Sequence, residues 1–239
     1  MKVLVIGGSG IVGTLVVPIL AETHQVRVFD LQPPQSEKCD YMVGDVTNFE
    51  ALRHAAVGMD GLIYMAMGNL KWTEVSGWVS AFDVNVKGVH LALRAAHEAG
   101  IEQAVYTSSM SVYGDDIMKR FFSDEELTPD AQHLYGFTKR LGEEVCQNAA
   151  RLWGMHINAL RLCLPVTEEK WLAQTVAGTP TIATTARDVA RALDAALRLK
   201  AGFQAFTISG DYEQKIMNMA KAKRLLNWEP LARPTRKPE

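Results

Sequence analysis

The amino-acid sequence begins with an apolar run and regularly spaced glycines, Met1-Lys2-Val3-Leu4-Val5-Ile6-Gly7-Gly8-Ser9-Gly10-Ile11-Val12-Gly13. The short apolar run predicts a buried parallel β-strand, and the apolar residues 11–20 predict a helix directly after it. In a phosphate-binding turn of this kind, one glycine permits the tight turn and a second admits backbone N–H groups to a pyrophosphate. A third glycine lets the helix pack close to the strand. The glycines at positions 7, 10 and 13 therefore indicate a dinucleotide-binding turn.

A second apolar run, residues 26–29, ends in Asp30. An acidic residue at the end of the second strand can accept hydrogen bonds from the adenosine ribose hydroxyls. Its carboxylate would also repel a 2′-phosphate, and residues 31–34 contain no arginine or lysine. NAD is therefore expected rather than NADP. The alternative is that Asp30 is only a turn residue before the proline pair.

Composition and charge fit a protein whose partner is a small molecule. The 239 residues suffice for one large domain, or one and a half, with a substantial core. The net charge of −2, without any basic run, argues against nucleic acid as a partner. Cys39, Cys146 and Cys163 are too widely spaced for a disulfide framework or a metal site, so no metal is expected. The first apolar run is too short for a signal peptide or a membrane span, and the cytoplasm is the default expectation.

Strand and helix signals alternate along the chain. Strands are expected at 40–43, 61–66, 104–107 and 156–162, and helices at 49–57, 78–100 and 135–153, with Thr47 or Asn48 as the cap of the first helix. This series predicts an α/β fold, a Rossmann-type doubly wound parallel sheet flanked by helices, with a small C-terminal substrate lobe. We expect an NAD-binding Rossmann domain over residues 1–164. A small substrate-binding lobe would follow over 165–239, interleaved with the last sheet strands and ending in a loosely held tail from Pro230.

Tyr135 and Lys139 open the helix expected at 135–153 with a spacing of four residues, which places both side chains on one helical face. A lysine ammonium beside a phenol stabilises the phenolate. We therefore expect Lys139 to lower the pKa of Tyr135 and make it a general acid or base. The strand at 104–107 leads into a serine-rich segment, 108–114, at the end of the sheet where ligands bind. A serine of this segment can hydrogen-bond the same substrate oxygen as the tyrosine.

These motifs together resemble the short-chain dehydrogenase/reductase superfamily, specifically its extended branch of NAD-dependent sugar epimerases, dehydratases and dehydrogenases. The resemblance covers nearly the whole chain and rests on the segments 7–13, 44–46, 62–66, 85–88, 107–114, 135–139, 160–165, 185–190 and 221–230. Tyr64 and Met67 depart from the His-x-Ala-Ala pattern of the family, and Asn227 replaces a glycine.

The resemblance implies a catalytic Ser-Tyr-Lys triad and a set of cofactor contacts. Ser109 takes the place of the catalytic serine, Tyr135 that of the base and Lys139 that of its partner, which also reaches the nicotinamide ribose. The implied contacts with NAD are Gly7, Gly10, Ile11, Val12, Gly13, Asp30, Asp45, Val46, Met65, Ala66, Met67, Asn85, Thr107, Tyr135, Lys139 and Leu162.

The function that this resemblance implies is NAD-dependent hydride transfer at a secondary alcohol of a sugar or sugar-derived substrate. A dehydrogenase is favoured, and a nucleotide-sugar epimerase or dehydratase with tightly held NAD is the alternative. A further alternative is a non-catalytic dinucleotide-binding or redox-sensing protein. Proteins of that kind in the superfamily commonly lose the tyrosine or the lysine, whereas both are present here.

Length and charge separate the chain from the nucleotide-sugar enzymes of this branch. About a hundred residues follow Lys139, which leaves little room for a uridine-diphosphate site. Lys170 is the one cation of residues 167–171, whereas a diphosphate needs arginines or several N–H donors. The chain is similar in length to uronate dehydrogenases, but it lacks the arginine with which those enzymes hold the carboxylate. The substrate is therefore left open, together with the roles of Lys71, Trp72 and Lys170.

The resemblance also implies a homodimer, because family members commonly pair the helices expected at 78–100 and 135–153 in a four-helix bundle. A two-fold contact of this kind uses the same patch on both subunits. The apolar residues that could form it are Val84, Leu91, Ala95, Leu141, Val145, Ala149 and Leu152. The alternative is that all of them face the sheet.

Overall fold

The computed structural model describes residues 1–114, 116–175 and 181–234, which are built around a parallel sheet of seven strands. In space the strands run in the order β3-β2-β1-β4-β5-β6-β9. Their bounds are β1 (Lys2–Ile6), β2 (Gln25–Asp30), β3 (Asp40–Val43), β4 (Gly61–Tyr64), β5 (Gln103–Ser109), β6 (His156–Leu162) and β9 (Phe203–Ile208). The chain builds outward from β1 to β3 and then returns to place β4 on the other side of β1. This order confirms the expected doubly wound fold.

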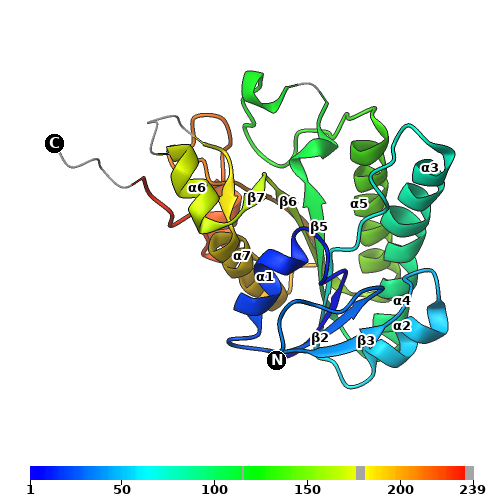
Figure 1. Cartoon of the computed structure of the whole chain (residues 1–239). Coiled ribbons are helices and arrows are strands. Elements are labelled where there is room, and N and C mark those ends of the chain that lie inside the picture. Colours follow the sequence, from blue (N-terminus) through cyan, green and yellow to red (C-terminus); the bar gives the residue numbers. More distant parts are fainter. Residues whose placement is uncertain (115, 176–180, 235–239) are drawn as a thin grey trace.

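Helices cover both faces of the sheet (Figure 1). One face carries α1 (Gly13–Leu20), α7 (Ala186–Arg198) and α8 (Ala220–Leu226). The other carries α2 (Phe49–Ala56), α4 (Val89–Glu98) and α5 (Leu134–Trp153). Because helices lie on both sides, the strands are apolar nearly throughout, and Val3, Leu4, Val5 and Ile6 are all 1% exposed or less. Each large side chain buried in this way contributes about 1.5–3 kcal/mol to folding.

Most elements agree with the sequence expectations, and β3 and β6 have the expected bounds. Asn48 caps α2, because its side chain accepts a hydrogen bond of 3.1 Å from the N–H of Ala51. The long helix expected at 78–100 is present as one unbroken helical run over residues 75–98, but it is not α-helical throughout. It begins at Val75 and consists of α3 (Val75–Phe82), a π-helical turn η1 (Asp83–Gly88) and α4. The hydroxyl of Tyr64 donates a 2.6 Å hydrogen bond to the carbonyl of Val84, which diverts that carbonyl at the point where the helix widens.

Two of the residues expected at a dimer interface belong instead to the core of the single chain. Ala95 is 2% exposed and Ala149 is 1% exposed, and both pack in the cluster beneath α4 and α5. Leu152, in contrast, is 67% exposed. The expectation for the two alanines was wrong because both are buried within the core of the single chain.

The second half of the chain adds a small two-stranded sheet of β7 (Pro165–Val166) and β8 (Thr184–Thr185), together with α6 (Glu168–Thr175). Its strand β9 pairs with β6 and completes the large sheet. The sequence analysis did not predict α6, α8 or β9.

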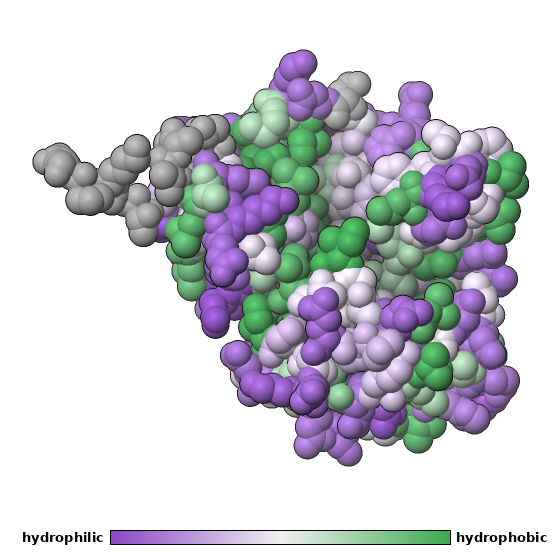
Figure 2. Space-filling model, in the orientation of Figure 1, coloured by the Kyte–Doolittle hydropathy of each residue, from purple (hydrophilic) through white to green (hydrophobic). Residues whose placement is uncertain are grey.

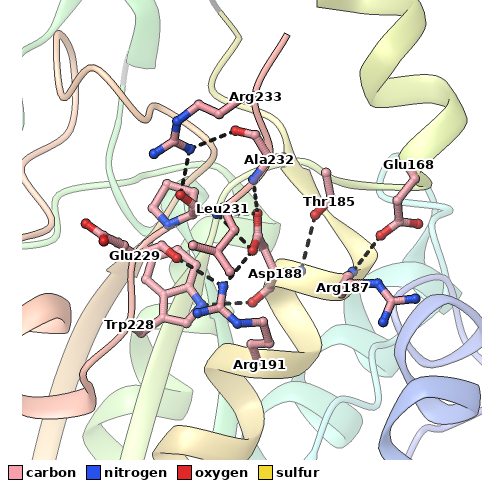
Figure 3. Close-up of polar contacts among 11 residues, drawn as sticks. Glu168, Thr185, Arg187, Asp188, Arg191, Trp228, Glu229, Leu231, Ala232 and Arg233 are labelled. Atoms are coloured by element: carbon pink, nitrogen blue, oxygen red, sulfur yellow. Dashed lines mark hydrogen bonds and ion pairs between the residues drawn. The ribbon is translucent and has the colours of Figure 1, made fainter. Parts of the chain in front are cut away.

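Asp188, near the start of α7, holds the C-terminal segment (Figure 3). Its carboxylate accepts hydrogen bonds from the backbone N–H groups of Leu231, at 3.0 Å, and Ala232, at 3.1 Å. Arg191 pairs with the same carboxylate at 2.8 Å, and the indole of Trp228 donates to the carbonyl of Asp188 at 2.9 Å. The expectation of a loosely held tail was therefore wrong for residues 231 and 232. Over the described ranges, no helix is both long and apolar enough to cross a membrane.

Candidate functional site

A cavity of about 950 Å³ lies at the carboxyl ends of β1, β2, β4, β5 and β6. The strand order reverses between β1 and β4, and doubly wound sheets bind their ligands at such a point. In Figure 2 this face of the molecule is hollowed, and apolar residues gather in the hollow. The cavity thus occupies the place that the sequence analysis predicted for a ligand.

The glycine-rich turn forms one end of the cavity, where Gly7 and Gly10 are part of its lining. Gly7 has a φ of 84°, and a side chain at this position would collide with the backbone of Ala66 at the end of β4. Gly13 lies behind the lining, where any Cβ would strike the backbone of Gly8. It therefore serves the close approach of helix α1 to the strand. Val12 precedes α1 without a side-chain cap and lines the cavity together with Ile11.

Asp30 ends β2, lines the cavity and holds the glycine-rich turn in place. One carboxylate oxygen accepts a 2.9 Å hydrogen bond from the N–H of Ser9, and the other accepts a 3.2 Å bond from Gln32. A carboxylate has about four lone-pair sites, so both oxygens keep the capacity to bind hydroxyl groups. Asp45 also lines the cavity, with its carboxylate bonded to the N–H and the hydroxyl of Thr47 at 2.8 and 2.9 Å.

Ser109, Tyr135 and Lys139 line the same cavity. Ser109 ends β5, whereas Tyr135 and Lys139 lie in the first turns of α5, which His133 caps by accepting a hydrogen bond from the N–H of Gly136. The hydroxyl oxygen of Ser109 accepts a 3.1 Å hydrogen bond from the N–H of Ser111, and this side chain acts to lower the pKa of Tyr135. The ammonium of Lys139 is buried and donates a 2.9 Å hydrogen bond to the carbonyl of Thr107.

Burial dominates the pKa values of these groups. It lowers the pKa of Lys139 to about 8, although the thiol of Cys146 and the carboxylate of Glu143 act in the opposite direction. Burial also raises the pKa of Tyr135, which the side chain of Ser109 only partly offsets. The expectation that Lys139 lowers the pKa of Tyr135 was wrong, because loss of solvent outweighs the helical neighbour whose ammonium is engaged by Thr107.

A buried charge network lies directly behind these residues. Glu143, one turn after Lys139, forms a 2.7 Å ion pair with Arg161 and accepts a 2.5 Å hydrogen bond from the hydroxyl of Ser108. Both charged side chains are less than a tenth exposed. Since the hydroxyl of Ser108 is committed to Glu143, Ser109 is the serine of this pair whose side chain acts on the pKa of Tyr135.

The cavity lining includes every implied NAD contact except Gly13 and Asn85. Asn85 is 2% exposed, and its side-chain amide is engaged on both sides. It accepts a 3.1 Å hydrogen bond from the N–H of Gly68 and donates a 2.9 Å bond to the hydroxyl of Thr138. Its position is that of a structural link between two segments of the site.

Sequence analysis missed the residues that α3, η1 and the segment after β6 contribute to the cavity. These are Leu70, Ser76, Val79, Ser80, Asp83, Val84, Leu164 and Pro165. Leu164 has a φ of 41°, which a leucine rarely adopts, and is 58% exposed. No pattern in the sequence predicts this conformation. Neither Lys71 nor Lys170 belongs to the described lining, whereas Trp72 stacks on the ring of Tyr135.

The described lining of the cavity carries few charges. Its one cationic side chain is that of Lys139, and its acidic side chains are those of Asp30, Asp45 and Asp83. Among the residues that the structure describes, no group of three or more histidine, cysteine or acidic side chains could hold a metal ion. The arrangement suits a dinucleotide together with a phenol that can exchange a proton with a substrate oxygen.

Comparisons with known proteins agree with this site. The chain is 39% identical over 156 residues to the 3-beta-hydroxysteroid dehydrogenase of Mycolicibacterium neoaurum, a match that covers 60% of this chain and 42% of that protein. It is 32% identical over 144 residues to the N-acetyl-alpha-D-glucosaminyl-diphospho-ditrans,octacis-undecaprenol 4-epimerase of Escherichia coli O157:H7, again with 60% and 42% covered. The chain thus spans less than half the length of these curated relatives.

A solved structure, MoeE5 in complex with UDP-glucose and NAD, has the same fold. Its TM-score is 0.79 at 18% identity, with 97% of this chain and 94% of that chain covered. Length therefore does not separate this chain from a protein solved with a nucleotide sugar, and that part of the sequence argument is not supported. A family model described as the 3-beta hydroxysteroid dehydrogenase/isomerase family matches residues 4–163. The chain belongs to the 3-beta hydroxysteroid dehydrogenase/isomerase family, within the extended short-chain dehydrogenases/reductases.

Proposed function

We propose that this protein is an NAD-dependent oxidoreductase that transfers hydride at a secondary alcohol, with Ser109, Tyr135 and Lys139 as its catalytic residues. One observation carries the proposal: these three side chains line the same cavity as the glycine-rich turn and Asp30. A dinucleotide bound along the turn would have one end at Asp30 and the other beside Tyr135. Such an arrangement brings a hydride acceptor and a proton acceptor to one substrate carbon.

NAD fits the residues at the glycine-rich end. Gly7 and Gly10 line the cavity without side chains, so that a pyrophosphate can approach the backbone of the turn that leads into α1. Asp30 has lone pairs left for the adenosine ribose hydroxyls. Val46, Met65, Met67 and Leu162 would add apolar contacts in the same cavity.

We also propose that residues 1–164 form the NAD-binding domain and residues 165–239 the substrate lobe, with Leu164 and Pro165 lining the cavity at their junction.

A bound nicotinamide would supply the hydride acceptor. The deprotonated phenolic oxygen of Tyr135 takes the proton of the substrate hydroxyl, and Ser109 hydrogen-bonds the oxygen of that hydroxyl. Lys139 adds a positive charge to the same cavity, and with a pKa of about 8 it carries that charge near neutral pH.

The charges of the cavity favour an uncharged substrate. The diphosphate or carboxylate of a substrate, beside the pyrophosphate of NAD, would need arginines or several further N–H donors, and Lys139 is the one cation of the described lining. The match to a 3-beta-hydroxysteroid dehydrogenase agrees with this preference. The expected sugar or sugar-derived alcohol remains a candidate of the same charge. Epimerisation with retained NAD is the second candidate, and the match to the Escherichia coli 4-epimerase is the observation that favours it.

A substrate panel tests the proposal. Purified protein is incubated with NAD and with hydroxysteroids, aldoses, uronates or nucleotide sugars, and NADH is followed by its absorbance. An uncharged alcohol should give NADH, and Tyr135→Phe should abolish the signal. Epimerisation would instead convert a nucleotide sugar without net NADH. Absence of both activities and of NAD binding would contradict the proposal.

We further propose a homodimer built on α3, η1, α4 and α5. Val84, Leu91, Leu141 and Val145 are partly exposed in the single chain, and Leu152 is largely exposed. Light scattering should give twice the single-chain mass of 26.4 kDa. A mass near 26.4 kDa would reject the dimer.

A cytoplasmic location is proposed as well, supported by three free cysteine thiols, since free thiols persist in reducing compartments.

A further inference from the structure

Trp72 stacks on the ring of Tyr135. The two ring centroids are 5.5 Å apart and their planes differ by 13°. Trp72 belongs to the segment that connects β4 to α3, whereas Tyr135 opens α5. The indole therefore covers one face of the phenol that the proposed function uses as base, and it comes from a different part of the chain.

Local contacts hold this segment in one conformation. The indole N–H of Trp78 donates a 2.8 Å hydrogen bond to the carbonyl of Trp72. Gly77 lies so close to the carbonyl of Lys71 that no side chain would fit there. The N–H of Asn69 donates a 2.9 Å bond to the hydroxyl of Ser80 on α3. The indole of Trp72 is thus presented by a segment anchored on α3 rather than by a free loop.

A second set of bonds ties the same segment to the helix of Tyr135. Asn85 accepts from the N–H of Gly68 and donates to the hydroxyl of Thr138. That hydroxyl in turn donates a 3.1 Å bond to the carbonyl of Tyr135. Because Trp72 and Tyr135 are linked both through this chain of bonds and through their rings, a shift of one segment would be felt at the other.

We infer that Trp72 is a positioning residue for Tyr135: its indole fixes the plane of the phenol and excludes water from one ring face, so that the hydroxyl points to Ser109. The inference rests on the proposed function, in which Tyr135 is the base. Stacked aromatic pairs contribute energy beyond the area that they bury.

Three variants test the inference. Trp72→Ala removes the stack, and Trp72→Phe retains a smaller one. Trp153→Ala is the matched control, because Trp153 stacks on His97 with the same 5.5 Å centroid distance and a 10° angle and lies outside the cavity lining. The first readout is nitration of Tyr135 by tetranitromethane at neutral pH, mapped by peptide mass spectrometry. It needs no turnover, so it is informative even if the proposed reaction is wrong.

Loss of the stack should expose the phenol and lower the pKa of Tyr135, since burial is what raises it. The phenolate fraction grows about tenfold for each unit by which the pKa falls. Nitration of Tyr135 should therefore be at least about threefold faster in Trp72→Ala than in Trp153→Ala, with Trp72→Phe between them. Equal nitration rates in Trp72→Ala and Trp153→Ala would overturn the inference.

The second readout is steady-state kinetics. In Trp72→Ala the basic group of the kcat profile should titrate at lower pH and kcat should fall, while KM for NAD stays unchanged. Trp72→Phe should restore most of kcat, and Trp153→Ala should match the wild type. A Trp72→Ala profile identical to the wild type would overturn the inference. If Tyr135→Phe retains ordinary turnover, the proposed function fails instead, whatever the nitration result.

Discussion

Replacing Lys139 with methionine should remove one contribution to the pH dependence of folding stability above neutral pH. Burial lowers the pKa of Lys139 from 10.5 to about 8 in the folded state. The unfolded chain therefore keeps its proton up to higher pH than the folded chain. The free-energy cost of burying the charge is fully present below pH 8, and it is relieved as the pH rises toward 10.5.

The size of this effect follows from the two pKa values. From about pH 7 to about pH 10, the free energy of unfolding should rise by about 2 to 3 kcal/mol on account of this one group. Methionine fills a similar volume without a charge, so the variant should lack that rise. The variant also loses the donor to the carbonyl of Thr107 and the ammonium 5.0 Å from the ring of Tyr106. The pH dependence of the free energy of unfolding, compared between wild type and variant, therefore isolates the effect of the charge better than stability at a single pH does.

Urea unfolding at a series of pH values measures the effect, with Lys200→Met as the control for loss of an exposed lysine. The side chain of Lys200 is 62% exposed, and its removal should leave the pH dependence unchanged. Parallel curves of stability against pH for the wild type and Lys139→Met would refute the reasoning. They would mean that the ammonium of Lys139 is not desolvated in the folded protein.

Three more outcomes are expected. Dissociation constants from isothermal titration should favour NAD over NADP by at least about tenfold, or about 1.4 kcal/mol, because the carboxylate of Asp30 repels a 2′-phosphate; equal affinities would contradict this. Glu143→Gln leaves the buried charge of Arg161 without its partner and should cost about 3–5 kcal/mol in urea unfolding. A loss below about 1 kcal/mol would show that the pair is dispensable. Asp188→Ala leaves the N–H groups of Leu231 and Ala232 without their acceptor and should cost about 1–3 kcal/mol, whereas Asp116→Ala, a change at a half-exposed carboxylate, should cost little; equal losses would contradict the role of Asp188.

Much of the fold could be predicted because its signals are local. The apolar strands and the glycines at 7, 10 and 13 report backbone requirements that neighbouring residues impose. The π-helical turn at Asp83–Gly88 could not be predicted, since it accompanies a hydrogen bond from Tyr64, some twenty residues away in sequence. Likewise, the tail is held by Asp188 through contacts across more than forty residues, which no local pattern reveals.

The candidate site likewise contains residues that could be predicted from the sequence and residues that could not. Residues on strand ends and in the first turns of α5 could be placed from their spacing, because the ends of parallel strands converge on one edge. The wall formed by Leu70, Val79 and Leu164 depends on where α3 and the segment after β6 pack. The direction of the pKa shift of Tyr135 also escaped prediction. The sequence spacing predicts that Tyr135 and Lys139 are neighbours on the helix. Burial, which depends on the whole fold, determines the direction in which the pKa of Tyr135 shifts.

The most direct test of the central claim compares wild type and Tyr135→Phe with a substrate found in the panel. The variant removes one hydroxyl and leaves the glycine-rich turn and Asp30 untouched. We expect NAD affinity, measured by isothermal titration, to be unchanged, while NADH formation falls by at least about a hundredfold. A variant that forms NADH at the wild-type rate would show that Tyr135 is not the base and that the Ser109–Tyr135–Lys139 assignment is wrong.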